Sequence, residues 1–581
     1  MAVTTDHTLT HLRKVGTGKG PAVQTTRAQV CKSDYPLFMN KVLSEQQNLT
    51  LIEGQVLSIF TSKDGSCVTG VQLVDSANNE SPQTVACSAV VLTTGTFLNG
   101  LCHEGRVKTV AAREGDQAVS GLASFMIDLG VRTRRFKTGT TPRIRLGSLD
   151  LSKTEVMPSE WDAGPLSFLH DRPFPKKELL PTWQTRTNAA THAFLQDNLM
   201  ESAMYSGEIE GVGPRYCPSI EDKVVRFASK DSHPIFLEQE EWESDSIYVQ
   251  GFSSSMPGDV QLAALKTIRG LENVSMIRPG YAVEYDMADP LQLAPTLMSK
   301  LLDGLFLAGQ INGTSGYEEA AGQGVVAGIN AARYASELEG IVLSRSESFI
   351  GVMIDDLVTK GVDDPYRMLT ARAEHRLHLR HDNADQRLTP LGREIGLVSD
   401  SRWQRFETKM ARIESAQNWL SETYFFEVDN LKLERRELAP VKGRASLGDL
   451  LKRPNVSLSL IEDLAREVGI DTSEGIPART TDGSFGSVSH AARSQVEIEA
   501  VYFGYLKRQD EEAQMASKLE ALKIPYDFDY RSLNGLSFES TEKFDHVRPL
   551  TVGQASRIPG VRPSDVALLI GHLRSKPRIR S

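Results

Sequence analysis

The chain has 581 residues, of which 40% are hydrophobic and 24% are charged, and its formal net charge at pH 7 is −10. This length exceeds what a single hydrophobic core serves, so we expect three or four domains of ordinary globular composition. The acidic charge argues against an overall nucleic-acid coating but not against a local basic surface, and no stretch approaches the roughly 20 apolar residues of a membrane-spanning helix.

The cysteine pattern and the first residues bear on the cellular compartment and on the kinds of site that the protein can hold. The cysteines form no CxxC pair, which suits a reducing compartment and argues against a disulfide framework and a zinc site. Residues 1–12 are polar and lack the apolar segment of a secretory signal, and no transit peptide is visible.

The first predicted elements are strands. Residues 48–60 alternate between polar and apolar side chains, and residues 69–74 and 84–92 continue that pattern, with turns at Asp64-Gly65 and at 76–79. Residues 89–96 form an apolar strand that ends in Thr-Gly, at Gly95. In flavoproteins such a strand brings backbone close to the cofactor's diphosphate, although this signal is weak by itself.

Residues 111–270 break the α/β rhythm, because Pro, Trp and Gly recur there at irregular spacing. We interpret them as a domain inserted between two parts of another. Within it, residues 136–144 bring a lysine, several hydroxyls, a glycine and an arginine into one loop. The loop is either an anion-binding site or a plain turn.

Cys217 lies just before a predicted helix, with Pro218 at the first helical position and Ser219 to Lys223 beginning the helix. A helix N-terminus stabilises a thiolate, and Arg215 and Lys223 add positive charge, which is how a nucleophilic cysteine is activated. The alternative is a small buried cysteine that packs at a helix cap. The residues alone leave both interpretations open.

Residues 305–333 carry the most informative pattern. An apolar run predicts a buried strand, a glycine-rich turn follows at 309–316, and residues 320–332 predict a helix of unusually small side chains. Glycines at a strand-to-helix turn let backbone N–H groups point at a phosphate or a ring carbonyl. Many flavoproteins close over the far end of FAD in this way. The alternative is a tightly packed strand–turn–helix, and the sequence of the whole segment favours the cofactor.

Beyond residue 345 the pattern becomes helical, with long helices predicted at 400–420, capped by Asp400 or Ser401, and at 495–522. Arg372, Arg376 and Arg380 recur every four residues, which predicts one stripe of a helix.

The tail, residues 543–581, holds eight Lys/Arg against two acids. Such local basic surfaces suit the phosphates of a folded RNA. The alternative is a solvated helix face whose arginines pair with Glu374, Asp382 and Asp385.

Taken together, these segments resemble the MnmG (GidA) family. Its members are FAD-dependent enzymes that install a carboxymethylaminomethyl-type group on the wobble uridine of certain tRNAs. The resemblance runs from about Lys19 to the C-terminus, and residues 555–561 are closer to the eukaryotic organellar branch. Its landmarks are residues 19–29, 90–100, 137–143, 211–227, 278–286, 308–321, 366–387 and 553–561.

The resemblance implies an α/β fold. A FAD-binding Rossmann-like domain, incomplete at its N-terminus, would comprise residues 1–110 and 271–345. An inserted α/β domain for NADH and substrate would comprise residues 111–270, and an all-α domain for tRNA and a partner would comprise residues 346–581.

The resemblance also implies site residues, without a metal. Cys217 would be one of two functional cysteines. FAD would contact Val56, Gly95, Gly309, Gln310, Asn312 and Gly313. NADH would contact Gly213, Arg215, Tyr216, Glu221 and Lys223. The tRNA would contact Arg367, Arg372, Arg376 and Arg380.

Further implications are a homodimer, an MnmE-type GTPase partner and a folate-derived one-carbon donor. The amine would be glycine or taurine. The location would be mitochondrial in a eukaryote and cytoplasmic in a bacterium.

The sequence departs from the family at its start. The family begins with a strand and a GxGxxG turn for the ADP half of FAD, then a second cysteine, and these are missing here. Residues 16–20 are no substitute, because no strand is predicted before them and their spacing is wrong. We therefore expect weak or no FAD binding and poor folding of the N-terminal domain. Two alternatives are a small-molecule FAD/NADH oxidoreductase and a non-catalytic tRNA-binding remnant.

Overall fold

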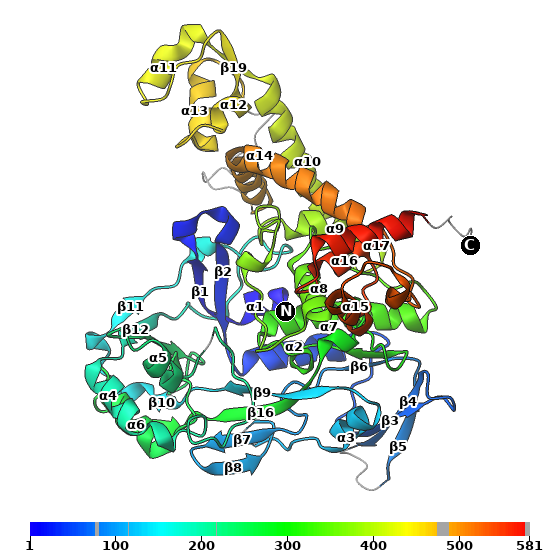
Figure 1. Ribbon diagram of the computed structural model, residues 1–581. Helices are drawn as coiled ribbons and strands as arrows, with labels where there is room; N and C mark the ends of the chain where they lie inside the picture. The colour runs from blue at the N-terminus through cyan, green and yellow to red at the C-terminus, as the bar shows by residue number, and fades with distance from the viewer. Residues whose placement is uncertain (76–80, 114, 217, 473–486, 576–581) are drawn as a thin grey trace.

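The computed structural model describes residues 1–75, 81–113, 115–216, 218–472 and 487–575. A body of several small sheets carries an α-helical arm at one end and a C-terminal helical bundle at its side (Figure 1). The mixed α/β class with a helical C-terminal region is confirmed. Among the described residues, no helix has the length and apolarity needed to cross a membrane.

Two parallel strands form the centre of the site. β6 (Val90–Leu92) pairs with β17 (Leu305–Leu307), with Val91 opposite Phe306. The long helix α7 (Tyr317–Ala335) packs on both strands. The three residues of β17 are fully buried, as the apolar run predicts, and they belong to the largest hydrophobic core.

An antiparallel sheet adjoins β17. Its strands are β3 (Gly54–Thr61), β4 (Val68–Asp75) and β5 (Gln83–Ala86), close to the predicted strands. Val68 N donates to Asp303 O (2.9 Å), which fixes this sheet to the start of β17. The turn predicted at residues 76–79 lies outside the described residues.

A second antiparallel sheet has the order β8 (Val107–Val110), β7 (Leu101–Glu104), β16 (Ala282–Ala288) and β9 (Thr133–Gly139). All seven residues of β16 are buried, because its neighbours cover both of its edges and its faces pack inside the body. This sheet joins β6 and β17 to the segment predicted as an insertion.

Most of that segment after β9, together with residues 276–278, folds around a six-stranded antiparallel sheet with its own apolar core. The strands, in sheet order, are β11 (Glu155–Met157), β12 (Thr182–Arg186), β13 (Pro234–Gln239), β14 (Ser246–Gln250), β10 (Arg143–Arg145) and β15 (Met276–Arg278). The helices are α3 (Gly121–Asp128), which precedes it, and α4 (Ala189–Asp197), α5 (Ile220–Arg226) and α6 (Gly258–Lys266) within it.

The N-terminal residues differ from the expectation. A strand, β1 (Leu9–Val15), does precede Gly16, after the short helix α1 (Ala2–Thr8). It pairs with β2 (Thr25–Val30) in an antiparallel hairpin, because Leu9 and Leu12 are buried against the inserted domain. Helix α2 (Asp34–Ser44) follows. Residues 1–44 therefore belong to this hairpin and its helices, not to the parallel sheet.

The arm is built on two long helices, α10 (Asp400–Glu422) and α14 (Ser487–Glu520), which run side by side for part of their length. The cap of α10 is Ser399, whose hydroxyl accepts from Arg402 N, rather than Asp400 or Ser401. The tip of the arm holds α11 (Asn430–Glu434), α12 (Leu447–Leu451), α13 (Leu458–Glu467) and a ladder of β18 (Tyr424–Phe426) and β19 (Arg444–Ser446).

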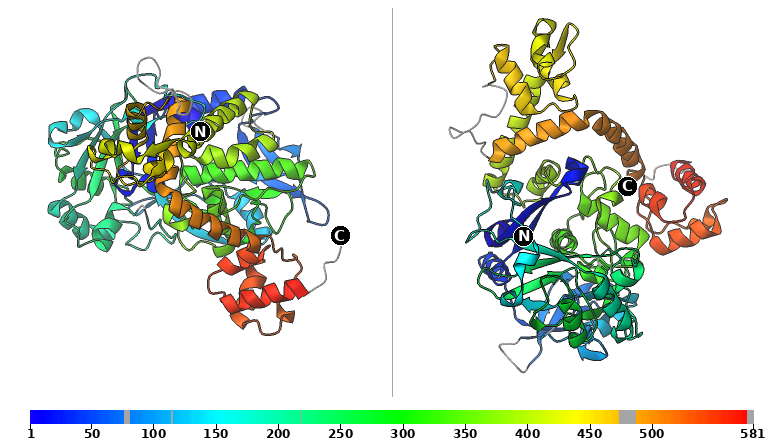
Figure 2. Two further views of the ribbon diagram at one scale, coloured as in Figure 1. Left: turned by 90° about the horizontal axis from the view of Figure 1, so that it is seen from above. Right: turned by 90° about the vertical axis from the view of Figure 1, so that its left-hand side faces the viewer.

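α14 extends from the arm to the C-terminal bundle (Figure 2). The bundle consists of α15 (Phe538–Val547), α16 (Val552–Arg557) and α17 (Pro563–Ser575) around its own core. Helix α8 (Phe349–Lys360) contacts both α7 and α16, and α9 (Ala384–Glu394) leads to α10.

One buried lysine ties the bundle to the body. Lys300 Nζ donates to Leu291 O (2.9 Å) in the body and to Val547 O (2.8 Å) at the end of α15. Burial lowers the pKa of Lys300 to about 8, and the neighbouring charge of Asp289 only partly opposes this shift. The bundle is therefore held by a cation that is costly to bury.

We predict that this cost appears as a pH dependence. Between pH 8 and about 10.4, the folded chain has lost the Lys300 proton while the unfolded chain keeps it, so folding becomes more favourable as pH rises. From pH 7 to pH 10, the stability of the unsubstituted chain should gain about 2 kcal/mol over Lys300→Met. Denaturant unfolding of both proteins at both pH values measures this. Parallel pH dependences would contradict the prediction.

Candidate functional site

The glycine-rich turn forms as predicted. After β17, Gly309 adopts φ +90°, a 3₁₀ turn follows at Gln310–Asn312, and Gly313 adopts φ +79°. Helix α7 then starts with Gly316 as its N-cap, without a side-chain capping bond. Ala308 N donates to Leu92 O (2.9 Å), so the turn stays fixed to β6.

Two amide side chains hold the turn from inside. Asn312 Nδ2 donates to Leu307 O (2.7 Å) and to Gln323 Oε1 (2.9 Å), and Gly309 N donates to the same Gln323 oxygen (3.1 Å). Both side chains are fully buried. The described contacts of Asn312 are therefore with the protein itself. Sequence reasoning missed Gln323. It could have been noticed because it is a long polar side chain in a helix made mostly of small residues.

Both glycines of the turn have backbone angles that other residues rarely adopt. An added Cβ at Gly313 would lie 2.6 Å from side-chain atoms of Met287 and Val362. At Gly309 it would meet Ala320 at 3.4 Å, in a backbone region that other residues rarely adopt. The turn is thus tightly packed, and packing accounts for part of its glycine content.

A glycine that follows β6 lies beside this turn. Gly95 follows β6 at φ +55°, and an added Cβ there would lie 3.6 Å from Gln310 Oε1. Glycines from both parallel strands thus converge, and the first turn of α7 has no capping side chain on its N–H groups. Such groups suit a ring carbonyl or a phosphate. Val56 lies in β3, opposite Leu73, in the neighbouring sheet.

The loop before Cys217 packs on the second sheet. Glu284 of β16 accepts from Gly211 N (2.6 Å) and Glu210 N (3.0 Å), and its other oxygen contacts His103 Nε2 (2.7 Å). Lys137 N donates to Val212 O (3.0 Å). Glu284, which sequence reasoning did not select, therefore fixes the loop that precedes the predicted nucleophile.

Cys217 itself lies outside the described residues, so its predicted reactivity stays a prediction. The helix after it begins two residues later than expected, at Ile220 instead of Pro218, because Ser219 is the N-cap of α5 and accepts from Asp222 N (3.3 Å). Gly213 lies beside Lys137, since a Cβ added there would come 3.5 Å from the lysine Cδ.

The other residues predicted for NADH divide into two groups. Glu221 is fully buried and accepts from Ser202 and Ser255, and Lys223 Nζ donates to Gly251 O (2.6 Å). By contrast, Tyr216 is exposed, and the largely exposed Arg215 pairs with Asp364 (3.1 Å). Tyr216 and Arg215 are accessible to a ligand, whereas Glu221 and Lys223 shape the domain.

Residues 136–144, predicted as one loop, form the end of β9, a short turn at 140–142 and the start of β10. Arg143 donates to Glu240 Oε1 (2.9 Å) and Thr141 O (2.7 Å), and its guanidinium lies over the ring of Tyr248 at 4.4 Å. Lys137 is 4% exposed. With its arginine committed to internal contacts, this loop matches the plain-turn interpretation better than the anion-binding one.

The predicted helical stripe of arginines is wrong. Between Tyr366 and Asn383 the helical structure is a 3₁₀ turn at Thr370–Arg372, and α9 begins only at Ala384. Residues 370–380 form short local turns instead, in which His378 N and Leu379 N both donate to His375 O. Residues 366–368, just before the stripe, bond to non-local partners. Tyr366 N donates to Gly313 O (2.8 Å), Ser315 N donates to Tyr366 O (3.2 Å), and Met368 N donates to Glu319 Oε1 (2.9 Å).

The four predicted arginines therefore have different environments. Arg376 is exposed, Arg367 is 38% exposed, and Arg372 lies over the ring of Tyr366 at 4.3 Å. Arg380 is only 2% exposed and donates to Asp382, Leu377 O and Gln495. The prediction that Arg380 contacts tRNA conflicts with this burial. The alternative of a solvated helix face is wrong as well: Arg380 pairs with Asp382, but Glu374 and Asp385 pair with Arg345 and Lys409.

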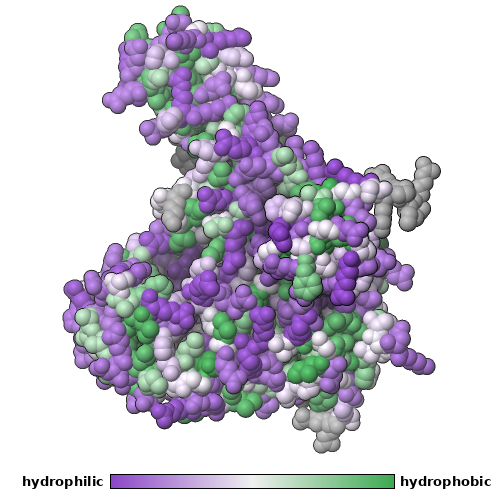
Figure 3. Space-filling view, viewed as in Figure 1, coloured by the Kyte–Doolittle hydropathy of each residue, from purple (hydrophilic) through white to green (hydrophobic). Residues whose placement is uncertain are grey.

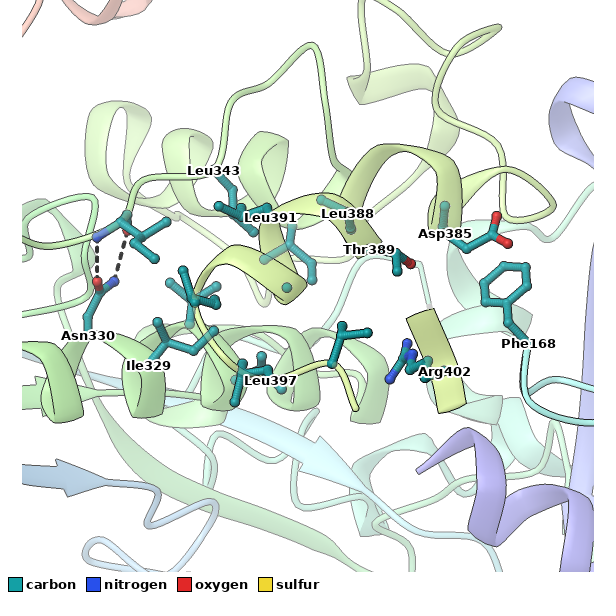
Figure 4. A pocket seen from close by; sticks show the side chains of 18 residues that line it. Phe168, Ile329, Asn330, Leu343, Asp385, Leu388, Thr389, Leu391, Leu397 and Arg402 are labelled. Carbon is teal, nitrogen blue, oxygen red and sulfur yellow. Dashed lines mark hydrogen bonds between the residues drawn. The ribbon is translucent and has the colours of Figure 1, made fainter. Parts of the chain in front are cut away.

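A separate apolar cavity of about 280 Å³ lies between α7 and α9. Figure 4 shows Ile329, Leu343, Leu388 and Leu391 pointing into it. Of its polar groups, Asp385 pairs with Lys409 (2.8 Å) and Asn330 donates to Ile341 O (2.9 Å). Its lining suits apolar contacts and not the polar groups of a nucleotide cofactor.

Comparisons with known protein families cover most of the chain. The family described as "Glucose inhibited division protein A" matches residues 1–339. The C-terminal helical domain of the tRNA modifying enzyme MnmG/GidA matches residues 400–510, and the C-terminal helical bundle of that enzyme matches residues 512–581.

Individual relatives agree with these matches. The tRNA uridine 5-carboxymethylaminomethyl modification enzyme MnmG of Syntrophotalea carbinolica is 44% identical over 574 residues, which is 99% of this chain and 88% of that protein. The MnmG of Geobacillus kaustophilus is 45% identical over 575 residues, covering 99% and 87% respectively. A structure of Aquifex aeolicus GidA superposes with a TM-score of 0.86 at 38% identity, covering 99% of this chain and 88% of that one.

The turn geometry generates a prediction with an internal control. Gly309→Ala should destabilise the protein by about 1–3 kcal/mol, because alanine is strained at φ +90°. Gly328→Ala, at an exposed position within α7 with no atom within 4 Å of the added Cβ, should stabilise it by about 0.5–1 kcal/mol. Urea unfolding midpoints of both variants measure the difference. Equal midpoints would refute the strain argument.

Proposed function

The chain belongs to the MnmG/GidA family, and we propose that it is an FAD-dependent enzyme that modifies the C5 position of the wobble uridine in tRNA. One observation carries the proposal beyond family membership. The glycine turn that fits a flavin is hydrogen-bonded to the segment that carries the accessible arginines, through Tyr366 and Gly313. A redox cofactor and an RNA would thus meet in one site.

In this proposal FAD supplies redox and one-carbon transfer chemistry when bound. Gly309, Gln310 and Gly313 approach one end of it, and the first turn of α7 offers N–H groups to its polar atoms. The expectation of weak FAD affinity stays a prediction. The visible absorption spectrum of the purified chain, recorded with and without added FAD, measures it.

The inserted domain is proposed to take NADH, with Arg215 and Tyr216 as the accessible contacts and Cys217 as a nucleophile. The resemblance also supports a folate-derived carbon donor, glycine or taurine as the amine, a homodimer and an MnmE-type GTPase partner. It supports a mitochondrial location in a eukaryotic source or a cytoplasmic one in a bacterium.

The two alternative functions are not favoured. A small-molecule oxidoreductase would leave the helical arm and the bundle without a role, although both match domains of a tRNA modifying enzyme. A non-catalytic remnant would need no flavin turn, yet the turn and its packing are intact.

We predict distinct effects for the arginines. Arg367→Ala and Arg376→Ala should each weaken binding of a tRNA transcript about 5-fold and lower the magnitude of the salt slope by about one, since each removes a phosphate contact. Arg380→Ala should instead lower the unfolding midpoint, because it leaves buried partners unpaired.

Arg145→Ala is the matched control, because Arg145 is an exposed arginine of the inserted domain that pairs with Asp245. Filter binding at several salt concentrations gives the affinities. Equal losses from Arg145→Ala and Arg376→Ala would argue for a diffuse charge effect and against a defined contact.

A further inference from the structure

Glu319 is a buried carboxylate between the glycine turn and the arginine segment. It lies in the first turn of α7 and is 5% exposed. Its Oε1 accepts from Arg367 Nε (3.2 Å) and from Met368 N (2.9 Å). One oxygen therefore holds both the side chain of Arg367 and the backbone of the next residue.

The protein makes space for this carboxylate by keeping a glycine beside it. A Cβ added at Gly316 would lie 1.8 Å from Glu319 Oε2 and 3.2 Å from Arg367 Nε. The backbone of Gly316 has φ −108°, which any residue can adopt. A side chain at position 316 would therefore displace the Glu319 carboxylate, although the backbone conformation there is open to any residue.

Arg367 is held at one end and accessible at the other. Its Nε is used by Glu319, while the side chain remains 38% exposed. An arginine presents five N–H donors in a rigid fork, so fixing Nε also sets the direction of the two terminal nitrogens. A guanidinium oriented in this way loses less entropy when it binds a phosphate.

Resting on the proposed function, we infer that Glu319 is a positioning residue for the RNA. It orients Arg367 toward a tRNA phosphate. Because Glu319 belongs to the helix that follows the glycine turn, it also fixes the position of the RNA relative to a ligand bound at the turn. The hydrogen bond between Arg367 and Glu319 is charge-assisted, and Glu319 is shielded from solvent. Such a pair holds one geometry, whereas a solvent-exposed ion pair samples many.

The test uses two substitutions that each disrupt the contact between Glu319 and Arg367. Glu319→Gln removes the charge that orients Arg367 but keeps an acceptor for Met368 N. Gly316→Ala displaces the carboxylate by its methyl group. Both should weaken binding of an unmodified tRNA transcript with a wobble uridine about 5-fold and lower the magnitude of the salt slope by about one. Neither should weaken the Arg367→Ala variant further, since Glu319 acts through Arg367.

The matched control is Glu318→Gln, which removes the same charge from the exposed neighbour in the same helical turn. It should not weaken tRNA binding. Equal losses from Glu319→Gln in the unsubstituted and the Arg367→Ala chains would overturn the inference, because the residue would then act through general stability. No loss in either chain would also overturn it. Absence of salt-sensitive tRNA binding by the unsubstituted chain would instead refute the proposed function.

Discussion

The pairing of the glycine turn with residues 366–368 is the constraint on which the site depends. Two backbone hydrogen bonds join Tyr366 to Gly313 and Ser315, and Glu319 adds contacts to the next two residues. These bonds fix residues 366–368, just before the other arginines, to the glycine turn. They also hold Arg367 next to the turn that follows β17.

Tyr366 extends this constraint to the C-terminal bundle. Its hydroxyl donates to Asp356 Oδ2 (2.9 Å), and Asp356 and Asp355 both accept from the buried Arg345. Arg557 of α16 then binds Asp355 through two bonds, at 2.7 and 2.8 Å. Breaking a buried ion pair is costly, so this network holds the bundle in its observed position.

The surface of the arm is mainly polar. The face in Figure 3 is largely hydrophilic along the arm, with apolar residues scattered between polar ones.

Strands, the glycine turn and the long helices were predictable from the sequence, because their periodicity and their glycines are local signals. The conformation around the arginines was not, because a spacing of four residues does not reveal the short turns that residues 370–380 adopt.

The sequence by itself determined the buried strand at 305–307, the glycines that the turn requires and the family to which the chain belongs. Only the tertiary structure decided that Arg380 is buried, that residues 9–30 form a hairpin on the inserted domain, and that Glu319 holds Arg367. The physical reason is the separation along the chain of the residues that interact. Side-chain size and backbone freedom act between neighbours in sequence, whereas burial and ion pairing arise between segments that meet only in the folded chain.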